Sequence, residues 1–160
     1  MDKSDWSKGF FSHLEKRADS DNAVVATLRR SLSFEPGTDA RTFPYIEPFI
    51  GNTSVAKRQL IYLIAGLWAQ TARRSSGKPL SIAAAMRKVA TNDSVSQRFT
   101  RLLDSDVEEL RWRLRQTLNL IASKRIAINW PQLLDDVLGW QWSSRSVQIR
   151  WAREFWKLDS

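Results

Sequence analysis

The sequence predicts an all-α protein, arranged as a two-lobed helical bundle of about eight helices. Apolar residues recur three and four positions apart through most of the chain, which is the spacing of one helix face. No segment alternates apolar and polar residues convincingly, as a half-buried strand does. With 160 residues, of which 42% are apolar, the chain can bury the core that such a bundle requires.

The first half of the chain contains three predicted helices and, third in order, a segment predicted as a short helix or a turn. This segment is rich in aromatic residues and proline, and it follows the helix breaker Glu35-Pro36-Gly37. The fourth is apolar on nearly all sides, so we expect it to be the central, most buried helix. The predicted ranges are 6–14, 24–32, 43–49 and 54–72.

The second half continues as helices after a predicted linker over residues 75–79, which contains Gly77 and Pro79. Ser81 is placed to cap the first of these helices. Asp106, with Glu109 three residues later, resembles a capping box in which Asp replaces Ser or Thr. The predicted ranges are 82–90, 95–103, 106–121, 130–138 and 144–158. We expect an N-terminal lobe over 1–78 and a C-terminal lobe over 79–160, with one continuous domain as the alternative.

The overall charge is strongly basic. The chain has 25 Lys and Arg against 17 Asp and Glu, a net charge of +8 and a pI near 10.3. Basic proteins of this size bind nucleic acid more often than anionic membranes. Residues 1–5 are polar and lack the apolar core of a signal peptide, and the longest apolar run, 60–69, is half of a membrane span. We therefore expect a soluble, cytoplasmic protein.

The sequence contains few of the side chains that commonly act in catalysis or bind metal ions. Cysteine is absent and His13 is the only histidine, so disulfides, thiolate or histidine metal sites and Ser-His nucleophile pairs are excluded. We expect no enzyme activity, no metal and no cofactor. Five of the eight tryptophans come after residue 129, where they build a core or an interface, with base stacking as the alternative.

Between Glu47 and Asp93 the chain has no carboxylate but seven cations. These are Lys57, Arg58, Arg73, Arg74, Lys78, Arg87 and Lys88. They cannot be neutralised within the stretch, so either acids from elsewhere in the fold or a bound polyanion must supply the counter-charge.

Several cations are candidates for contacts to phosphate. Arg111 and Arg115 lie four apart on the helix over 106–121, and Arg98 and Arg101 lie three apart on the preceding helix. Lys57 and Arg58 stand in the first turns of their helix, where the helix dipole disfavours cations. Arg29 and Arg30 end a helix, where interaction with the dipole is the simpler explanation. The predicted nucleic-acid-binding residues are Arg29, Arg30, Lys57, Arg58, Arg98, Arg101, Arg111 and Arg115.

Two other functions fit the same residues. The segment 80–103 permits a helix-turn-helix, in which the second helix would read a DNA sequence. Alternatively, the protein is a purely structural helical adaptor whose cations contact acidic protein partners.

The order of several short motifs resembles the CasB family, the small subunit of the type I-E CRISPR Cascade complex. The similarity extends over roughly residues 22–156. In order, the motifs are Leu28-Arg29-Arg30, Phe43-Pro44-Tyr45 with Pro48-Phe49, Ser81-Ile82, Val89-Ala90, Arg98-Phe99, Arg101-Leu102-Leu103, Leu110-Arg111, Leu114-Arg115, Ile128-Asn129-Trp130-Pro131 with Leu133, and Leu138-Gly139-Trp140. One departure is Ala83-Ala84-Ala85, where the family often has a Gly-Arg pair; here the cations follow later, at Arg87 and Lys88.

The resemblance implies a non-catalytic, all-helical subunit. Its implied partners are the CasC backbone, the large subunit CasA, a second CasB copy, the guide RNA, and the target and displaced DNA strands. Its basic surface would steady the guide RNA–target DNA hybrid and the displaced strand of the R-loop. Because base pairing selects the sequence, such a protein needs only contacts to phosphate.

Overall fold

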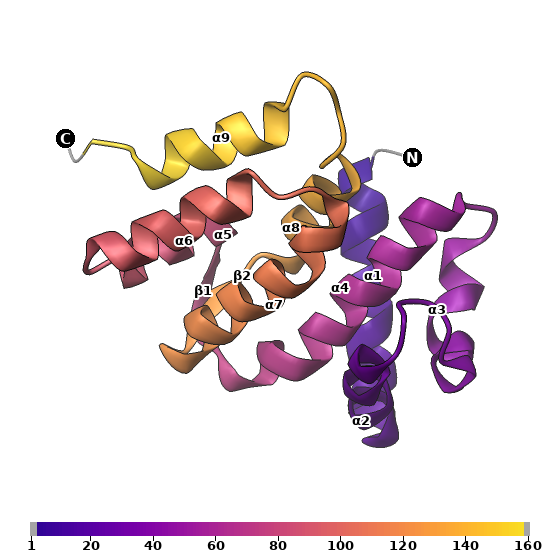
Figure 1. Cartoon of the computed structure of the whole chain (residues 1–160). Coiled ribbons are helices and arrows are strands. Elements are labelled where there is room, and N and C mark those ends of the chain that lie inside the picture. The colour runs from indigo at the N-terminus through magenta and orange to yellow at the C-terminus, as the bar shows by residue number, and fades with distance from the viewer. Residues whose placement is uncertain (1–2, 159–160) are drawn as a thin grey trace. The chain divides into compact units, whose positions relative to one another are not determined.

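The computed structural model describes residues 3–158, and it confirms the predicted all-α class (Figure 1). In chain order the helices of this part are α1 (Lys3–Ser20), α2 (Ala23–Arg30), α3 (Phe43–Ile50), α4 (Val55–Thr71), α5 (Ile82–Val89), α6 (Asp93–Leu103), α7 (Val107–Ser123), α8 (Trp130–Leu138) and α9 (Ser146–Phe155). Short 3-10 helices are η1 (Ser31–Ser33), η2 (Ala40–Thr42) and η3 (Ala72–Arg74). Met1 and Asp2, which belong to the polar N-terminal segment, lie outside the described residues. No helix of the described chain has both the length and the apolar content that crossing a membrane requires.

The chain forms two compact units, which we call unit 1 and unit 2. Unit 1 contains the chain up to Arg73 together with Trp130–Leu138, and unit 2 contains Arg74–Asn129 and the chain from Gly139. The predicted lobes, 1–78 and 79–160, are each continuous in sequence, whereas the compact units are not, because α8 packs on α1 and α4. As a statement about separate folding domains, the division into lobes stays a prediction.

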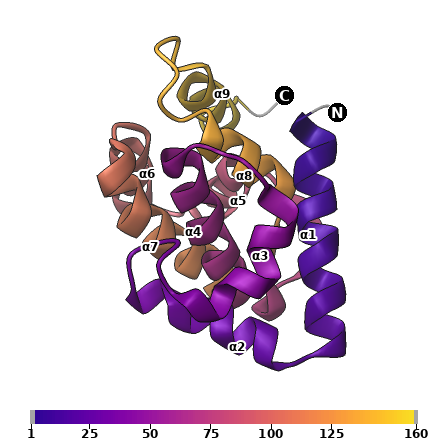
Figure 2. The ribbon, with the colours of Figure 1, turned by 90° about the vertical axis from the view of Figure 1, so that its right-hand side faces the viewer.

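Unit 1 is built around α4, which packs against α2 and α8 (Figure 2). Every residue of α4 from Leu60 to Ala69 is buried, which confirms α4 as a central helix. Gly66 allows α2 to approach closely, because a Cβ atom there would lie 2.7 Å from the Leu32 side chain and 3.2 Å from the Leu28 carbonyl oxygen. The same unit buries Phe10, Leu14 and Ile46 completely.

Unit 2 packs α5 against α9, α7 and α6. Its core contains Phe99, which stacks on Phe155 with ring centroids 4.3 Å apart, and the fully buried Leu110 and Leu114. Trp140 and Trp151 are also buried, and the Trp140 indole N–H donates to the Ser105 carbonyl oxygen at 2.8 Å. Trp140 and Trp151 therefore build core, as the first of the two alternatives predicted, and Trp130 is buried as well. Trp142 and Trp156 are 49% and 50% exposed, so for these two the choice between an interface and base stacking stays a prediction.

The predicted linker over 75–79 is wrong. Residues Ser76–Leu80 form the strand β1, which pairs in parallel with β2 (Ile126–Ile128). The ladder is flanked by backbone hydrogen bonds from Ser76 N to Arg125 O and from Asn129 N to Leu80 O. The pattern gave no sign of a strand because β1 contains Gly and Pro and most of its residues are exposed. Its partner backbone, 46 or more residues later in the chain, determines the pairing.

Two predicted helix starts are confirmed. The Ser81 hydroxyl accepts from the Ala84 N–H at 3.1 Å, and the Asp106 carboxylate accepts from the Glu109 N–H at 2.8 Å. The Glu109 side chain forms an ion pair with Arg113 at 3.2 Å instead of completing a capping box, because the i,i+4 arginine offers a full opposite charge.

Candidate nucleic-acid interface

Arg58 is the most extensively bound of the predicted cations. Its Nε and Nη2 donate to Glu47 Oε1 at 2.8 and 2.6 Å, and its Nη1 donates to the Gly37 carbonyl oxygen at 2.7 Å. The guanidinium also lies over the rings of Phe43 and Tyr62, at 5.2 and 4.7 Å from their centroids. These contacts hold Arg58 within unit 1, which explains a cation near a helix start without a ligand.

Glu47 and Tyr62 complete the same network, since the Tyr62 hydroxyl donates to Glu47 Oε1 at 2.7 Å. Burial alone would raise the pKa of Glu47, but the hydrogen bonds from Tyr62 and Arg58 outweigh it and hold that pKa below its ordinary value. Burial and the adjacent Glu47 carboxylate raise the pKa of Tyr62. We call Arg58, Glu47 and Tyr62 the unit 1 network.

The cations between Glu47 and Asp93 are therefore partly neutralised by acids that lie outside this stretch of the sequence. Arg58 pairs with Glu47, at the border of the stretch, and Arg73 lies 4.0 Å from Asp19 on α1. Lys57 is different, because its side chain is exposed on the first turn of α4 and forms no ion pair within residues 3–158, while its backbone N–H donates to Ser54 Oγ. Lys57 thus remains available for an external anion.

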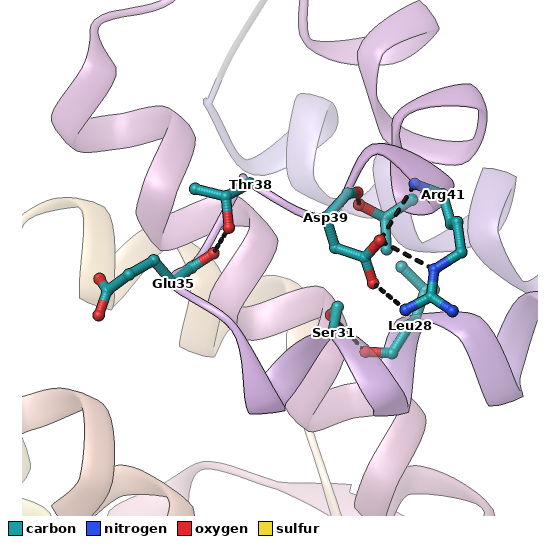
Figure 3. A network of polar contacts seen from close by, with 7 residues as sticks. Leu28, Ser31, Glu35, Thr38, Asp39 and Arg41 are labelled. Atoms are coloured by element: carbon teal, nitrogen blue, oxygen red, sulfur yellow. Dashed lines mark hydrogen bonds and ion pairs between the residues drawn. The ribbon is translucent and has the colours of Figure 1, made fainter.

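Arg29 and Arg30 are exposed in the last turn of α2, close to a local ion pair. The carboxylate of Asp39 accepts from Arg41 Nε and Nη2 at 3.0 and 3.1 Å, as Figure 3 shows. The hydrogen bond from Arg41 is the main cause of the lowered pKa of Asp39, and the charge of Arg30 contributes. Two further hydrogen bonds stabilise the surrounding turns: the Ser31 hydroxyl donates to the Leu28 carbonyl oxygen, and the Thr38 hydroxyl donates to the Glu35 carbonyl oxygen.

In unit 2, α6 and α7 enclose a polar pocket of about 280 Å³. Arg98 and Arg101, both exposed, line it from α6. The lining residues from α7 are Trp112, Arg113, Gln116 and Thr117. We call this the α6–α7 pocket. Three arginines therefore line one concave surface.

Arg113 is the member of this pocket that the sequence reading did not select. Its guanidinium forms an ion pair with Glu109 at 3.2 Å and also lies 4.9 Å from the Trp112 ring centroid. Its Nε is buried with no hydrogen-bond partner among the described residues, a state that costs about 1–3 kcal/mol. The sequence did offer one signal for selecting Arg113. It lies next to Trp112 and three residues before Gln116, on the face of α7 that packs toward α6.

Arg111 and Arg115 do not line the α6–α7 pocket. At about 100° per residue, they lie on the opposite side of Trp112 from Gln116. Arg111 forms an ion pair with Glu108 at 3.2 Å, whereas Arg115 is exposed. The structure thus combines Arg98 and Arg101 with Arg113, and not with the two arginines that the sequence reading grouped with them.

His13 has a packing role in unit 1. Its Nε2 lies 2.9 Å from the Tyr45 carbonyl oxygen, and its ring stacks on Phe49. Among residues 3–158, no three His, Cys, Asp or Glu side chains come together in a group able to hold a metal ion.

These features define a small, basic, helical protein whose cations are distributed over two compact units and include those of the α6–α7 pocket. The chain belongs to the Cse2 family of CRISPR-associated proteins, because the model of that family matches residues 24–156. The resemblance to the CasB family is thereby confirmed, since solved members of this fold carry the name CasB.

Known relatives agree in sequence and in structure. A CRISPR-associated protein Cse2 from Thermus thermophilus is 39% identical over 137 residues, which cover 84% of this chain and 79% of the relative. The crystal structure of CasB from Thermus thermophilus matches with a TM-score of 0.85 at 34% identity, covering 95% of this chain and 98% of the other. The crystal structure of M. ruber CasB matches with a TM-score of 0.82 at 35% identity, covering 94% and 91%. A chain of a CRISPR RNA-guided surveillance complex shares the fold, with a TM-score of 0.84 at 17% identity and coverage of 96% and 93%.

Proposed function

We propose that this protein is a non-catalytic small subunit of a Cascade surveillance complex that binds nucleic acid through sequence-independent contacts to phosphate. Membership in the Cse2 family is the observation that carries the proposal. A chain of the same fold belongs to a solved CRISPR RNA-guided surveillance complex. The proposed partners are the CasC backbone, the large subunit CasA, a second copy of this chain, the guide RNA and both DNA strands, in the cytoplasm of a prokaryote.

The physical role would be to stabilise the open R-loop. Exchange of a DNA duplex for an RNA–DNA hybrid is nearly balanced in free energy, so a few contacts to the strand backbones shift it. Each neutralised phosphate also releases condensed counterions, which favours binding at low salt. Such contacts need exposed cations on a rigid frame, and no base-specific geometry.

The described cations differ in their suitability for this role. Arg98 and Arg101 have exposed side chains at a concave surface, and Arg29, Arg30, Lys57 and Arg115 are exposed on their helices. Arg58 and Arg111 are engaged in ion pairs at 2.6 and 3.2 Å. We therefore place Arg98 and Arg101 first among the predicted phosphate contacts and Arg58 last.

The proposal is tested by titrating the full chain onto single-stranded, double-stranded and R-loop substrates over a range of salt. We expect sequence-tolerant binding with a log–log salt slope of about −3 to −6, as several neutralised phosphates give. The double variant Arg98→Glu/Arg101→Glu should make the slope shallower. Arg73→Glu/Lys78→Glu is the matched control, since it changes the net charge equally through two other exposed cations.

The two alternatives predict different results. A helix-turn-helix reader, with α5 and α6 as its two helices, would enrich one DNA sequence in a binding selection. A purely structural adaptor would retard neither DNA nor RNA at moderate salt. Binding that the control variant weakens as much as the test variant would contradict the proposed surface.

A further inference from the structure

The α6–α7 pocket has a feature that contacts to phosphate alone do not require, namely an exposed indole. Trp112 lines the pocket with 51% of its surface exposed, beside Arg98 and Arg101. We propose that this pocket receives one unpaired nucleotide of a single strand, with its base stacked on Trp112 and its phosphate bound by Arg98 and Arg101. This inference rests on the proposed function and names the form of nucleic acid that one part of the surface recognises.

The small size of the pocket limits what it can hold. Its volume of about 280 Å³ lies below the ~300–1,000 Å³ of pockets that enclose drug-sized ligands. A base that remains paired in a duplex cannot enter a depression of this kind, whereas an unstacked base can. The pocket is also held on rigid elements, because α6 buries Phe99 and Leu102 while α7 buries Leu110 and Leu114.

The indole of Trp112 is contacted by an arginine and is otherwise exposed to solvent. The guanidinium of Arg113 lies 4.9 Å from its ring centroid, and no aromatic ring of the described chain contacts Trp112. Half of the side chain therefore remains free for a base. A stacking surface with guanidinium groups beside it is the composition by which proteins bind single strands without sequence preference.

Arg113 acts in this pocket as a positioning residue. Its Nη2 is held by Glu109 at 3.2 Å, so its guanidinium supports the indole while its charge is already compensated. Arg98 and Arg101 are the groups that bring uncompensated charge to the pocket, since they form no ion pair with a described residue. The division of roles places stacking on α7 and phosphate binding on α6.

Phe34 in unit 1 provides a matched comparison. It is also 51% exposed and has an arginine, Arg41, over its ring at 5.9 Å. That arginine is paired with Asp39 at 3.0 Å, and Phe34 is not among the residues that line the α6–α7 pocket. Phe34→Ala therefore removes an exposed aromatic side chain of similar setting without touching the proposed site.

The test compares two single-stranded DNA probes of equal length, one intact and one abasic at every position. Both carry the same number of phosphates, so their affinity ratio reports the bases alone. We expect the wild-type chain to bind the intact strand about fivefold tighter or more, the lower end of what one stacked base gives. Trp112→Ala should bring the ratio close to one, Trp112→Phe should retain most of it, and Phe34→Ala should leave it unchanged.

The outcomes separate this inference from the proposed function. A wild-type ratio near one, or a ratio that Trp112→Ala leaves intact, overturns the nucleotide pocket, while salt-dependent binding of both probes would preserve the proposed function. Failure to bind either probe overturns both. Circular dichroism of each variant shows whether the fold is retained. If Trp112→Ala unfolds, Trp112→Leu decides the case, because it keeps an apolar side chain but removes the ring on which a base could stack.

Discussion

Arginines in the two compact units are used differently. In unit 1, Arg58 donates three hydrogen bonds to Glu47 and to a backbone carbonyl, and it lies over two aromatic rings. In unit 2, Arg98 and Arg101 are exposed at a pocket. A cation without a nearby acid in the sequence can therefore be either a structural group or a binding group, and only the fold distinguishes the two.

The largest expected effect is on the stability of unit 1. Arg58→Ala removes several charge-assisted hydrogen bonds and leaves the half-buried Glu47 with Tyr62 alone. We expect a loss of about 2 kcal/mol in the free energy of unfolding, measured by chemical denaturation. The same change at Arg98 should cost less than about 0.5 kcal/mol, as exposed sites usually do. Equal losses at the two positions would contradict the comparison.

Binding should show the opposite order. Arg98→Ala removes one proposed contact to phosphate, so the salt slope for single-stranded DNA should become shallower by about 0.7. Arg58→Ala, assayed at a temperature where it is folded, should leave the slope unchanged. The measurement is a titration at several salt concentrations. A shallower slope for Arg58→Ala, with no change for Arg98→Ala, would show that Arg58 and not Arg98 contacts phosphate.

Acid should weaken the unit 1 network. The pKa of Glu47 is lowered in the folded protein, so its contribution is fully present above its ordinary value of about 4.3 and is lost as the pH falls through the folded value. We expect the stability difference between wild type and Glu47→Gln to shrink between pH 7 and pH 3. Its size at pH 7 should be about 1 kcal/mol or less, because the side chain is 39% exposed. Chemical denaturation at pH 7 and pH 3 measures this stability difference. A difference that does not depend on pH would exclude an ion pair between an ionised Glu47 and Arg58.

The smallest effect should come from the ion pair between Arg73 and Asp19. The two groups are 4.0 Å apart, with side chains 55% and 81% exposed, so solvent screens their attraction. Asp19→Ala should change the free energy of unfolding by no more than about 0.3 kcal/mol. A loss comparable with that of Arg58→Ala would show that unit 1 depends on its exposed pairs as well.

The helices were predictable because their information is local. The apolar spacing of α7 and the caps at Ser81 and Asp106 each lie within a few residues of the chain. The β1–β2 ladder was not predictable, since its two strands are distant in sequence and β1 is mostly exposed. The buried role of α4 followed from its composition, whereas the return of α8 to unit 1 depends on tertiary packing.

The candidate site could be predicted only in part. Arg98 and Arg101 were selected from their spacing, but their grouping with Arg111 and Arg115 ignored the angle between those residues around α7. Arg113 was not selected, although it lines the pocket beside Arg98 and Arg101. The network of Arg58 could not be foreseen either, since Glu47 lies eleven residues earlier and reaches it only after α3 and α4 fold.

The route of α8 has a consequence for synthesis on the ribosome. Trp130 packs beside Phe11, and Ser7 of α1 donates a hydrogen bond to Asp135. A nascent chain that ends before residue 130 carries all the other helices of unit 1 but lacks α8, so part of its aromatic core faces water. Unit 1 therefore matures only after Trp130–Leu138 has been made, and a cut near residue 80 would yield two fragments of which neither contains a complete unit.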